Sequence, residues 1–250
     1  MRVTRVYVDA PLAGGALLWL PPGPAQHVAR VLRAAPGHPL IVFNGMGGEF
    51  AATIEALRRD AVQVRLGAHQ AVERESPLVT ILLQGVARGE KMDQILQKAT
   101  ELGVSRVLPV LSARSTVRLE PAAAQRKQHH WQAVAIGACE QCGRNRVPQV
   151  EPPMSLAAAL ERAAAGLRLV LAPDGSTGLR SLPLGTQVAR SVALLAGPEG
   201  GLAPEEVAAA AQAGFITCRL GPRVLRTETA ALAALAALQF AAGDLDHAAP

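Results

Sequence analysis

The chain has 250 residues, half of them hydrophobic, and a formal net charge of +5. This length suffices for one large domain or two modest domains with buried cores. The sequence has no uninterrupted apolar run long enough to cross a bilayer, and its N-terminal stretch mixes apolar and charged side chains, which argues against a membrane span and a secretion signal. We therefore expect a soluble, cytoplasmic protein.

Residues 1–75 predict a small β-rich module of the β-barrel type. The stretch 39–57 has two strand-like runs on either side of a glycine turn, which is typical of a hairpin, and 61–66 alternates again. Between the first strands, residues 26–33 have helical spacing. The segment 70–77 is charged and ends in proline, so it predicts a linker.

After this linker, apolar strand-like runs alternate with helical patterns. The alternation predicts an α/β domain with a mostly parallel sheet. The predicted strands cover 78–86, 104–111, 167–172, 191–196 and 215–220. The predicted helices cover 91–102, 121–142, 155–166, 204–214 and 227–240.

Three of these strands end in turns rich in glycine and proline, namely 172–176 (APDGS), 196–201 (AGPEGG) and 220–226 (LGPRVLR). Ligands of open α/β sheets lie outside the carboxyl ends of strands, so we expect the three turns to form one slot. Glycine lets the backbone approach a ligand closely. The turns have neither a lysine after the glycines nor GxGxxG spacing, which disfavours a phosphate-binding NTPase and favours an adenosine-like cofactor without phosphates.

Cys139 and Cys142 form a CxxC pair, but the chain has three cysteines, an odd number that argues against a disulfide framework. A zinc site would need two further ligands, and the nearby candidates, His129 and His130, are predicted to lie on the same helix. A redox site would need a thioredoxin-like context. We expect two ordinary helical thiols and no metal.

Basic residues are concentrated in the middle of the chain, where residues 88–146 contain ten Lys and Arg against five Asp and Glu. A clustered basic surface suits a polyanion such as RNA or DNA, and a solvated charged face is an equally good interpretation. The same two interpretations apply to the arginines of the first module, and Arg144 with Asn145 either binds RNA or closes a helix. The candidate RNA contacts in these regions are Arg5, Arg30, Arg33, Arg144 and Asn145.

The segment GPEGG followed by LGPRVLRTETAALAAL closely resembles the signature of the SPOUT methyltransferases, in particular the small-subunit rRNA uridine-N3 methyltransferase (RsmE-like) family. Further blocks resemble the same family in the same order: RVYVD, QHVARVLR, VFNGMGGEF, EKMDQILQKATELGVSRVLPVLSARS and ACEQCGRNRVP. Two departures are minor. Cys142 stands where a small hydroxyl residue is expected, and the helix 155–166 is plainer than usual.

The resemblance implies a SPOUT-type α/β domain with a C-terminal trefoil knot at 76–250 and a PUA-like β-barrel that helps hold RNA at 1–72. It also implies S-adenosylmethionine bound in the knot, a homodimer, and 3-methyluridine in 16S rRNA of the small ribosomal subunit as the product. The expected cofactor contacts are Ala172, Leu195, Gly197, Pro198, Gly201, Leu220, Val224 and Leu225.

Methylation of uridine at N3 requires loss of the imide proton and stabilisation of the resulting anion. Arg226, which ends the third turn, is our candidate for that stabilisation, and Arg114 is a candidate clamp for a phosphate or the base. Glu199 is the carboxylate nearest the expected cofactor, where it acts as the base, orients the slot or only accepts hydrogen bonds from its own loop. Solvent is an alternative proton acceptor.

Two other functions are compatible with the same fold. The first is methylation of a ribose 2′-hydroxyl, against which the N-terminal module and the ACEQCGRN block argue. The second is a non-catalytic ribosome-assembly factor, which the intact glycine turns disfavour. The position of the methyl group distinguishes the first alternative, and failure to bind S-adenosylmethionine would favour the second.

Overall fold

The computed structural model describes residues 3–31, 34–59, 61–115, 120–184, 186 and 190–246. The chain divides into two compact units, which we call the first and the second unit. The first consists of Met1–Glu75 with Cys139–Val147, and the second of Ser76–Ala138 with Pro148–Pro250. The sequence did not predict that a segment after residue 138 would pack with the N-terminal module.

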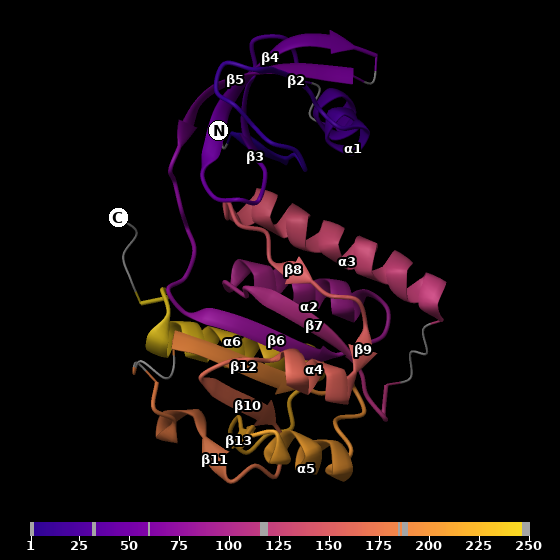
Figure 1. Ribbon diagram of the computed structural model, residues 1–250, viewed down its shortest axis with the longest axis vertical. Helices are drawn as coiled ribbons and strands as arrows, with labels where there is room; N and C mark the ends of the chain where they lie inside the picture. The colour runs from indigo at the N-terminus through magenta and orange to yellow at the C-terminus, as the bar shows by residue number, and fades with distance from the viewer. Residues whose placement is uncertain are drawn as a thin grey trace. The chain divides into compact units, whose positions relative to one another are not determined.

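The first unit contains a five-stranded sheet in the order β1-β3-β4-β5-β2 (Figure 1). β1 pairs with β3 in parallel and the other pairs are antiparallel, so the predicted hairpin is confirmed as β3 with β4. Among the described residues, the pairing runs from β1 to β2 without a pair that closes the sheet. The elements are β1 (Thr4–Tyr7), β2 (Leu17–Trp19), α1 (Pro22–Gln26), η1 (His27–Val31), β3 (Pro39–Phe43), β4 (Glu49–Arg58) and β5 (Ala61–Gln70).

The second unit is an α/β domain whose strands all pair in parallel, as the alternation of strands and helices predicts. The strand order is β11-β13-β10-β12-β6-β7-β8, with β9 also beside β7. The predicted long strands are confirmed, whereas β8, β9 and β11 are two-residue pairings too short for a sequence pattern to reveal. The strands are β6 (Val79–Gly85), β7 (Arg106–Leu111), β8 (Gln149–Val150), β9 (Met154–Ser155), β10 (Leu167–Leu171), β11 (Thr177–Gly178), β12 (Ser191–Ala196) and β13 (Ile216–Arg219).

Helices cover both faces of this parallel sheet (Figure 1). Successive side chains of a strand point to opposite faces, and in β6 Leu82 packs in the core with α2, α3 and α6 whereas Leu83 packs in the core with α4 and α5. None of the described helices is both long and apolar enough to cross a bilayer. The helices are α2 (Glu90–Glu101), α3 (Pro121–Cys142), α4 (Leu156–Arg162), η2 (Leu179–Ser181), α5 (Pro204–Gln212) and α6 (Thr227–Ala242).

Candidate functional site

The turns after β10, β12 and β13 line one cavity of about 810 Å³ in the second unit. They meet because parallel strands present their carboxyl ends at the same edge of the sheet. The volume lies in the range of small-molecule sites, roughly 300–1,000 Å³. The expected slot is therefore present, with lining residues from 171–174, 196–204 and 218–227.

All but one of the residues expected to contact the cofactor line this cavity. The exception is Leu195, whose side chain is fully buried in the core beside α4 and α5. Because strand side chains alternate, its neighbour Ala196 faces the opposite side and lines the cavity instead. We correct the prediction for Leu195 accordingly.

The turn at residues 197–201, which we call the glycine turn, is folded tightly on itself. Gly201 has φ +69°, and its N–H donates to the carbonyl of Pro198 over 2.9 Å. A Cβ at Gly197 would lie 2.9 Å from the backbone of Gly201, so a side chain there has no room. Glycine at these positions is what lets the turn keep this shape.

The glycine turn is also pressed against the end of β6. A Cβ at Gly85 would lie 2.5 Å from the Pro198 ring. Beside it, the buried Gln84 amide donates to Gly85 O over 3.0 Å and to the hydroxyl of Thr227 over 3.0 Å. These contacts fix the glycine turn and the start of α6, both of which line the cavity, against the end of β6.

Glu199 lies on the cavity lining, where its carboxylate is held by the start of α2. It accepts the N–H of Arg88 over 3.1 Å and lies 3.3 Å from the Lys91 ammonium. Burial alone would raise the pKa of Glu199, but hydrogen bonds from its own N–H and from Arg88, together with Lys91, lower it below its ordinary value. This environment favours an orienting role over that of a general base.

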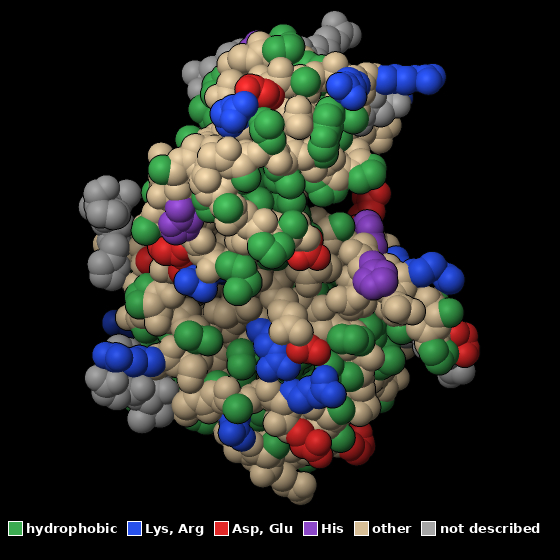
Figure 2. Space-filling model, turned by 45° about the horizontal axis from the view of Figure 1, so that its top comes forward, with side chains coloured by type: hydrophobic (Ala, Val, Ile, Leu, Met, Phe, Trp, Pro, Cys, Tyr) green, Lys and Arg blue, Asp and Glu red, His purple; other side chains and the backbone are tan. Residues whose placement is uncertain are grey.

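Among the described residues, five cationic side chains line the same cavity together with two carboxylates, Asp174 and Glu199. Arg226 occupies the N-cap position of α6, and Arg114 donates to the carbonyl of Gly200 over 3.3 Å. Figure 2 shows basic side chains beside acidic ones on one face of this unit. The cations are Lys91, Arg114, Arg219, Arg223 and Arg226.

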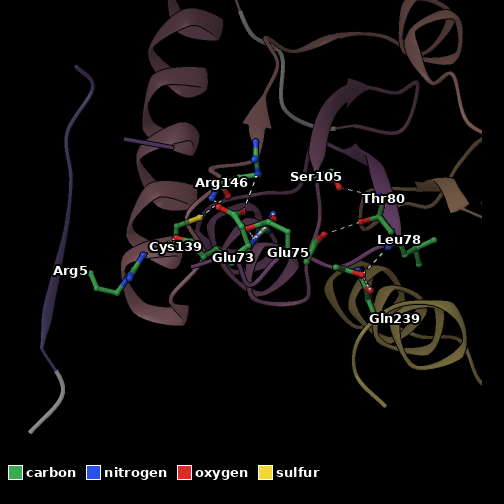
Figure 3. A network of polar contacts seen from close by, with 12 residues as sticks. Arg5, Glu73, Glu75, Leu78, Thr80, Ser105, Cys139, Arg146 and Gln239 are labelled. Carbon is green, nitrogen blue, oxygen red and sulfur yellow. Dashed lines mark hydrogen bonds and ion pairs between the residues drawn. The ribbon is translucent and has the colours of Figure 1, made fainter. Parts of the chain in front are cut away.

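Three of the expected RNA contacts of the first unit are buried in a polar network, and Figure 3 labels one of them, Arg5. Arg5 donates to Glu49, to the Asn145 side chain and to the carbonyl of Arg144. Arg144 in turn forms an ion pair with Glu75. Because Arg5, Arg144 and Asn145 are at most 7% exposed, we correct their role to structural. Their burial joins segment 139–147 to the first unit.

The two remaining candidates of this unit have different outcomes. Arg30 is exposed on η1, so its role as a phosphate contact stays a prediction. Arg33 lies outside the described residues.

The CxxC cysteines have no metal-binding cluster around them among the described residues. Cys139 is buried and its thiol lies 3.7 Å from the carbonyl of Arg146 (Figure 3). Burial raises the pKa of the Cys139 thiol to about 12, so the thiol stays protonated at neutral pH. This state favours the interpretation of an ordinary helical thiol.

Sequence reasoning missed several residues that build the site. Gln84 donates to the Thr227 hydroxyl and Glu206 accepts the N–H of Ala113, and no local pattern marks contacts to segments so far away in the chain. Arg219 and Arg223 also line the cavity, at the end of β13 and in the turn that follows it. The sequence could have predicted both, because they lie next to expected cofactor contacts at the same strand end.

The chain is similar to RNA-modifying proteins along almost its whole length. A family model described as an RNA methyltransferase domain matches residues 74–239, and one described as an RNA methyltransferase PUA domain matches residues 25–67. Ribosomal RNA small subunit methyltransferase E of Buchnera aphidicola is 32% identical over 245 residues, which cover 98% of each protein. The protein of that name from Bacillus subtilis is 34% identical over 225 residues, 86% of each protein.

Two solved structures with high coverage contain a bound ligand. Ribosomal RNA small subunit methyltransferase E from Neisseria gonorrhoeae, bound to S-adenosyl methionine, has a TM-score of 0.89 and 34% identity and covers 98% of this chain and 100% of that chain. A Legionella pneumophila protein in complex with the bound cofactor SAM has a TM-score of 0.94 and 42% identity, with the same coverage.

Proposed function

Because the chain belongs to the ribosomal RNA small subunit methyltransferase E family, we propose that it transfers the methyl group of S-adenosylmethionine to N3 of a uridine in 16S rRNA. The observation that carries this proposal is the single cavity formed by the three strand-end turns, with Arg226 on its lining. We infer the cofactor and the class of RNA from the family, and the place of the reaction from the cavity.

The cavity residues fit S-adenosylmethionine. The small residues glycine, alanine and proline of the turns let backbone N–H and C=O groups reach the adenine and ribose. The turns also lack the Gly-Lys-Ser/Thr motif that binds nucleotide phosphates. The residues that would hold the cofactor are Ala172, Gly197, Pro198, Gly201, Leu220, Val224 and Leu225. The bound cofactor supplies an electrophilic methyl group on a sulfonium.

The protein's own residues serve the uridine. N3 lies on the Watson–Crick edge, so the base must be unpaired or flipped out before it enters the cavity. Deprotonation of N3 leaves negative charge on O2 and O4, and the Arg226 guanidinium offers donors for this charge. Arg114 binds a phosphate or the base at the same cavity, and Arg30 contributes a phosphate contact from the first unit. Glu199 orients the glycine turn, and solvent takes the proton.

We further propose that the second unit, residues 76–250, carries the trefoil knot of the SPOUT fold. In support, β13 lies on one side of β10 in the sheet, whereas β12 and β6 lie on the other side. The helix α6 follows β13 in the chain but packs against β12 and β6. Residues 1–72 form the PUA-like barrel in this proposal, which the match of residues 25–67 supports. The segment 139–147 is added to that domain.

A cytoplasmic homodimer completes the proposal. Its support is the exposed apolar surface of the second unit, where Val79 on β6 and Phe240 on α6 are 47% and 64% exposed. Sedimentation equilibrium at micromolar concentration tests this state, and a monomer would contradict it.

The test of function is methyl transfer from labelled S-adenosylmethionine to small subunits that lack the modification, followed by digestion to nucleosides. We expect label in 3-methyluridine. Label in a 2′-O-methylated nucleoside or in another base would retain the cofactor and overturn the specificity. Cofactor binding without any transfer to subunits or free 16S rRNA would indicate a different RNA, and absence of cofactor binding would favour an assembly factor.

A further inference from the structure

Glu206, in the first turn of α5, binds two backbone N–H groups that are far apart in the sequence. One carboxylate oxygen accepts the N–H of Ala203 over 2.8 Å, and the other accepts the N–H of Ala113 over 2.8 Å. The bond to Ala203 closes the N-terminus of α5, as a carboxylate at this helix position commonly does. Capping does not account for the second bond, which reaches the segment after β7.

That segment, residues 112–115, is held from two further directions. The Ser115 hydroxyl donates to the carbonyl of Val86 at the end of β6 over 2.9 Å. The Arg114 guanidinium donates to the carbonyl of Gly200, and a Cβ on Gly200 would lie only 3.1 Å from the Cβ of Arg114. The segment is therefore packed directly against the glycine turn, and Arg114 lines the cavity as a consequence.

We propose that Glu206 is a positioning residue that holds Arg114 at the cavity for RNA. This inference rests on the proposed function, in which Arg114 binds the substrate RNA. A carboxylate suits the task because each oxygen accepts one N–H, and hydrogen bonds to a charged acceptor are about twice as strong as neutral ones. Ala113 and Arg114 are exposed, and the bond to Glu206 holds the backbone N–H directly before Arg114. Without this bond the segment keeps its contacts to Val86 and Gly200, but the guanidinium samples more positions, including ones away from the RNA.

Glu205 provides a matched control. It precedes Glu206 in the same helical turn and therefore has a similar favourable interaction with the helix dipole. It is exposed, and among the described residues it has no hydrogen bond to the segment 112–115. Glu205→Ala thus removes a first-turn carboxylate without disturbing the bond to Ala113.

The experiment compares Glu206→Ala, Glu206→Gln, Glu205→Ala and Arg114→Ala by steady-state kinetics on unmodified small subunits. We expect Glu206→Ala to raise the KM for the subunit about tenfold, the size of one lost charged hydrogen bond. Glu206→Gln keeps an amide of the same shape with one acceptor oxygen, so it should fold and show a smaller increase. Glu205→Ala should retain the wild-type KM, and the Kd for S-adenosylmethionine should stay within about twofold in all variants.

The double variant Glu206→Ala with Arg114→Ala separates positioning from general destabilisation. If Glu206 acts through Arg114, the double variant has the same subunit KM as Arg114→Ala alone. Additive losses, or a loss of cofactor affinity in Glu206→Ala, overturn the inference. An unchanged KM in Arg114→Ala removes the RNA role of Arg114 from the proposed function, whereas an effect of Arg114→Ala without one of Glu206→Ala overturns the positioning role alone.

Discussion

The Thr227 hydroxyl donates to the carbonyl oxygen of Gly197 over 2.5 Å, which bonds the first residue of α6 to the first residue of the glycine turn. The same hydroxyl accepts a hydrogen bond from the buried amide of Gln84 at the end of β6. One hydroxyl therefore connects three segments that are far apart in the sequence. Arg226 immediately precedes Thr227, so this connection also fixes the backbone position from which the Arg226 side chain extends.

Thr227→Val tests this connection, since valine has nearly the same shape but no hydroxyl. The change leaves the buried Gln84 amide and the Gly197 carbonyl without this partner, at a cost of about 1–3 kcal/mol. We expect the affinity for S-adenosylmethionine to fall about tenfold, measured by titration calorimetry. Thr227→Ser keeps the hydroxyl and should bind as the wild type does. Wild-type affinity in Thr227→Val would show that the turn keeps its shape without this bond.

Gly85→Ala should disable cofactor binding by a steric route. The added methyl group would lie 2.5 Å from the Pro198 ring, so the glycine turn has to move. We expect the Kd for S-adenosylmethionine to rise at least about tenfold, because the cavity walls are displaced. The matched control is Gly137→Ala in α3, where the methyl group would have nothing within 4 Å. That change should leave binding intact and stabilise the helix by about 0.5–1 kcal/mol. Equal affinities in the two variants would contradict the prediction.

The sequence predicts the second unit well because its strands and helices have clear periods and its ligand edge follows from parallel topology. The three turns could be chosen from glycine and proline alone. The prediction for Leu195 was wrong because it assumed that every residue at the strand end faces the ligand. Side chains of a strand alternate between the two faces of the sheet, and that of Leu195 faces the core. The errors at Arg5 and Arg144 have another cause. Their partners, Glu49 and Glu75, lie 44 and 69 residues away, so nothing local distinguishes them from surface arginines.

Arg226→Lys tests the role assigned to the guanidinium. Lysine keeps the positive charge but loses the planar pair of donors, so the charge on O2 and O4 of uridine is stabilised less well. We expect the single-turnover rate at saturating cofactor to fall roughly tenfold for Arg226→Lys and a hundredfold or more for Arg226→Ala. Cofactor affinity should be nearly unchanged. The control is Arg126→Lys on α3, because Arg126 is not one of the described residues that line the cavity. This variant should keep the full rate. A similar rate in all three variants would exclude Arg226 from the chemical step.

Glu199→Gln tests whether this carboxylate takes the proton. Its pKa is lowered, so Glu199 is already ionised above its ordinary value of 4.5 and its charge does not change between about pH 6 and 9. We therefore expect the shape of the pH–rate profile to be the same in Glu199→Gln and the wild type, with a rate about fivefold lower because the contacts to Lys91 and Arg88 are weakened. A profile that loses its dependence on pH in the variant would identify Glu199 as the base.

Arg5→Ala tests the structural role given to the buried network of the first unit. The change removes the buried cation beside the Glu49 carboxylate and leaves it with Asn145 and the partly exposed Arg74, at a cost of about 3–5 kcal/mol. The matched control is Arg65→Ala, which breaks the exposed pair with Glu55 and should cost less than about 1 kcal/mol. Hydrogen exchange of the β4 amides measures local unfolding of this unit and compares the two. Equal protection in both variants would show that the buried pair contributes no more than the exposed one.

The same pair gives the first unit a defined response to acid. Burial alone would raise the pKa of Glu49, but hydrogen bonds from Arg5 and Asn145 and the charges of Arg5 and Arg74 lower it. A carboxylate with a lowered pKa stabilises the folded state above its ordinary pKa of 4.5, and this contribution is lost as the pH falls through the lowered value. We expect β4 protection in the wild type to decline below about pH 4.5 and the decline to be shallower in Glu49→Gln, which has no proton to gain. Identical acid profiles would mean that other carboxylates determine the response, so Glu49 would have to be ionised equally well in the unfolded chain.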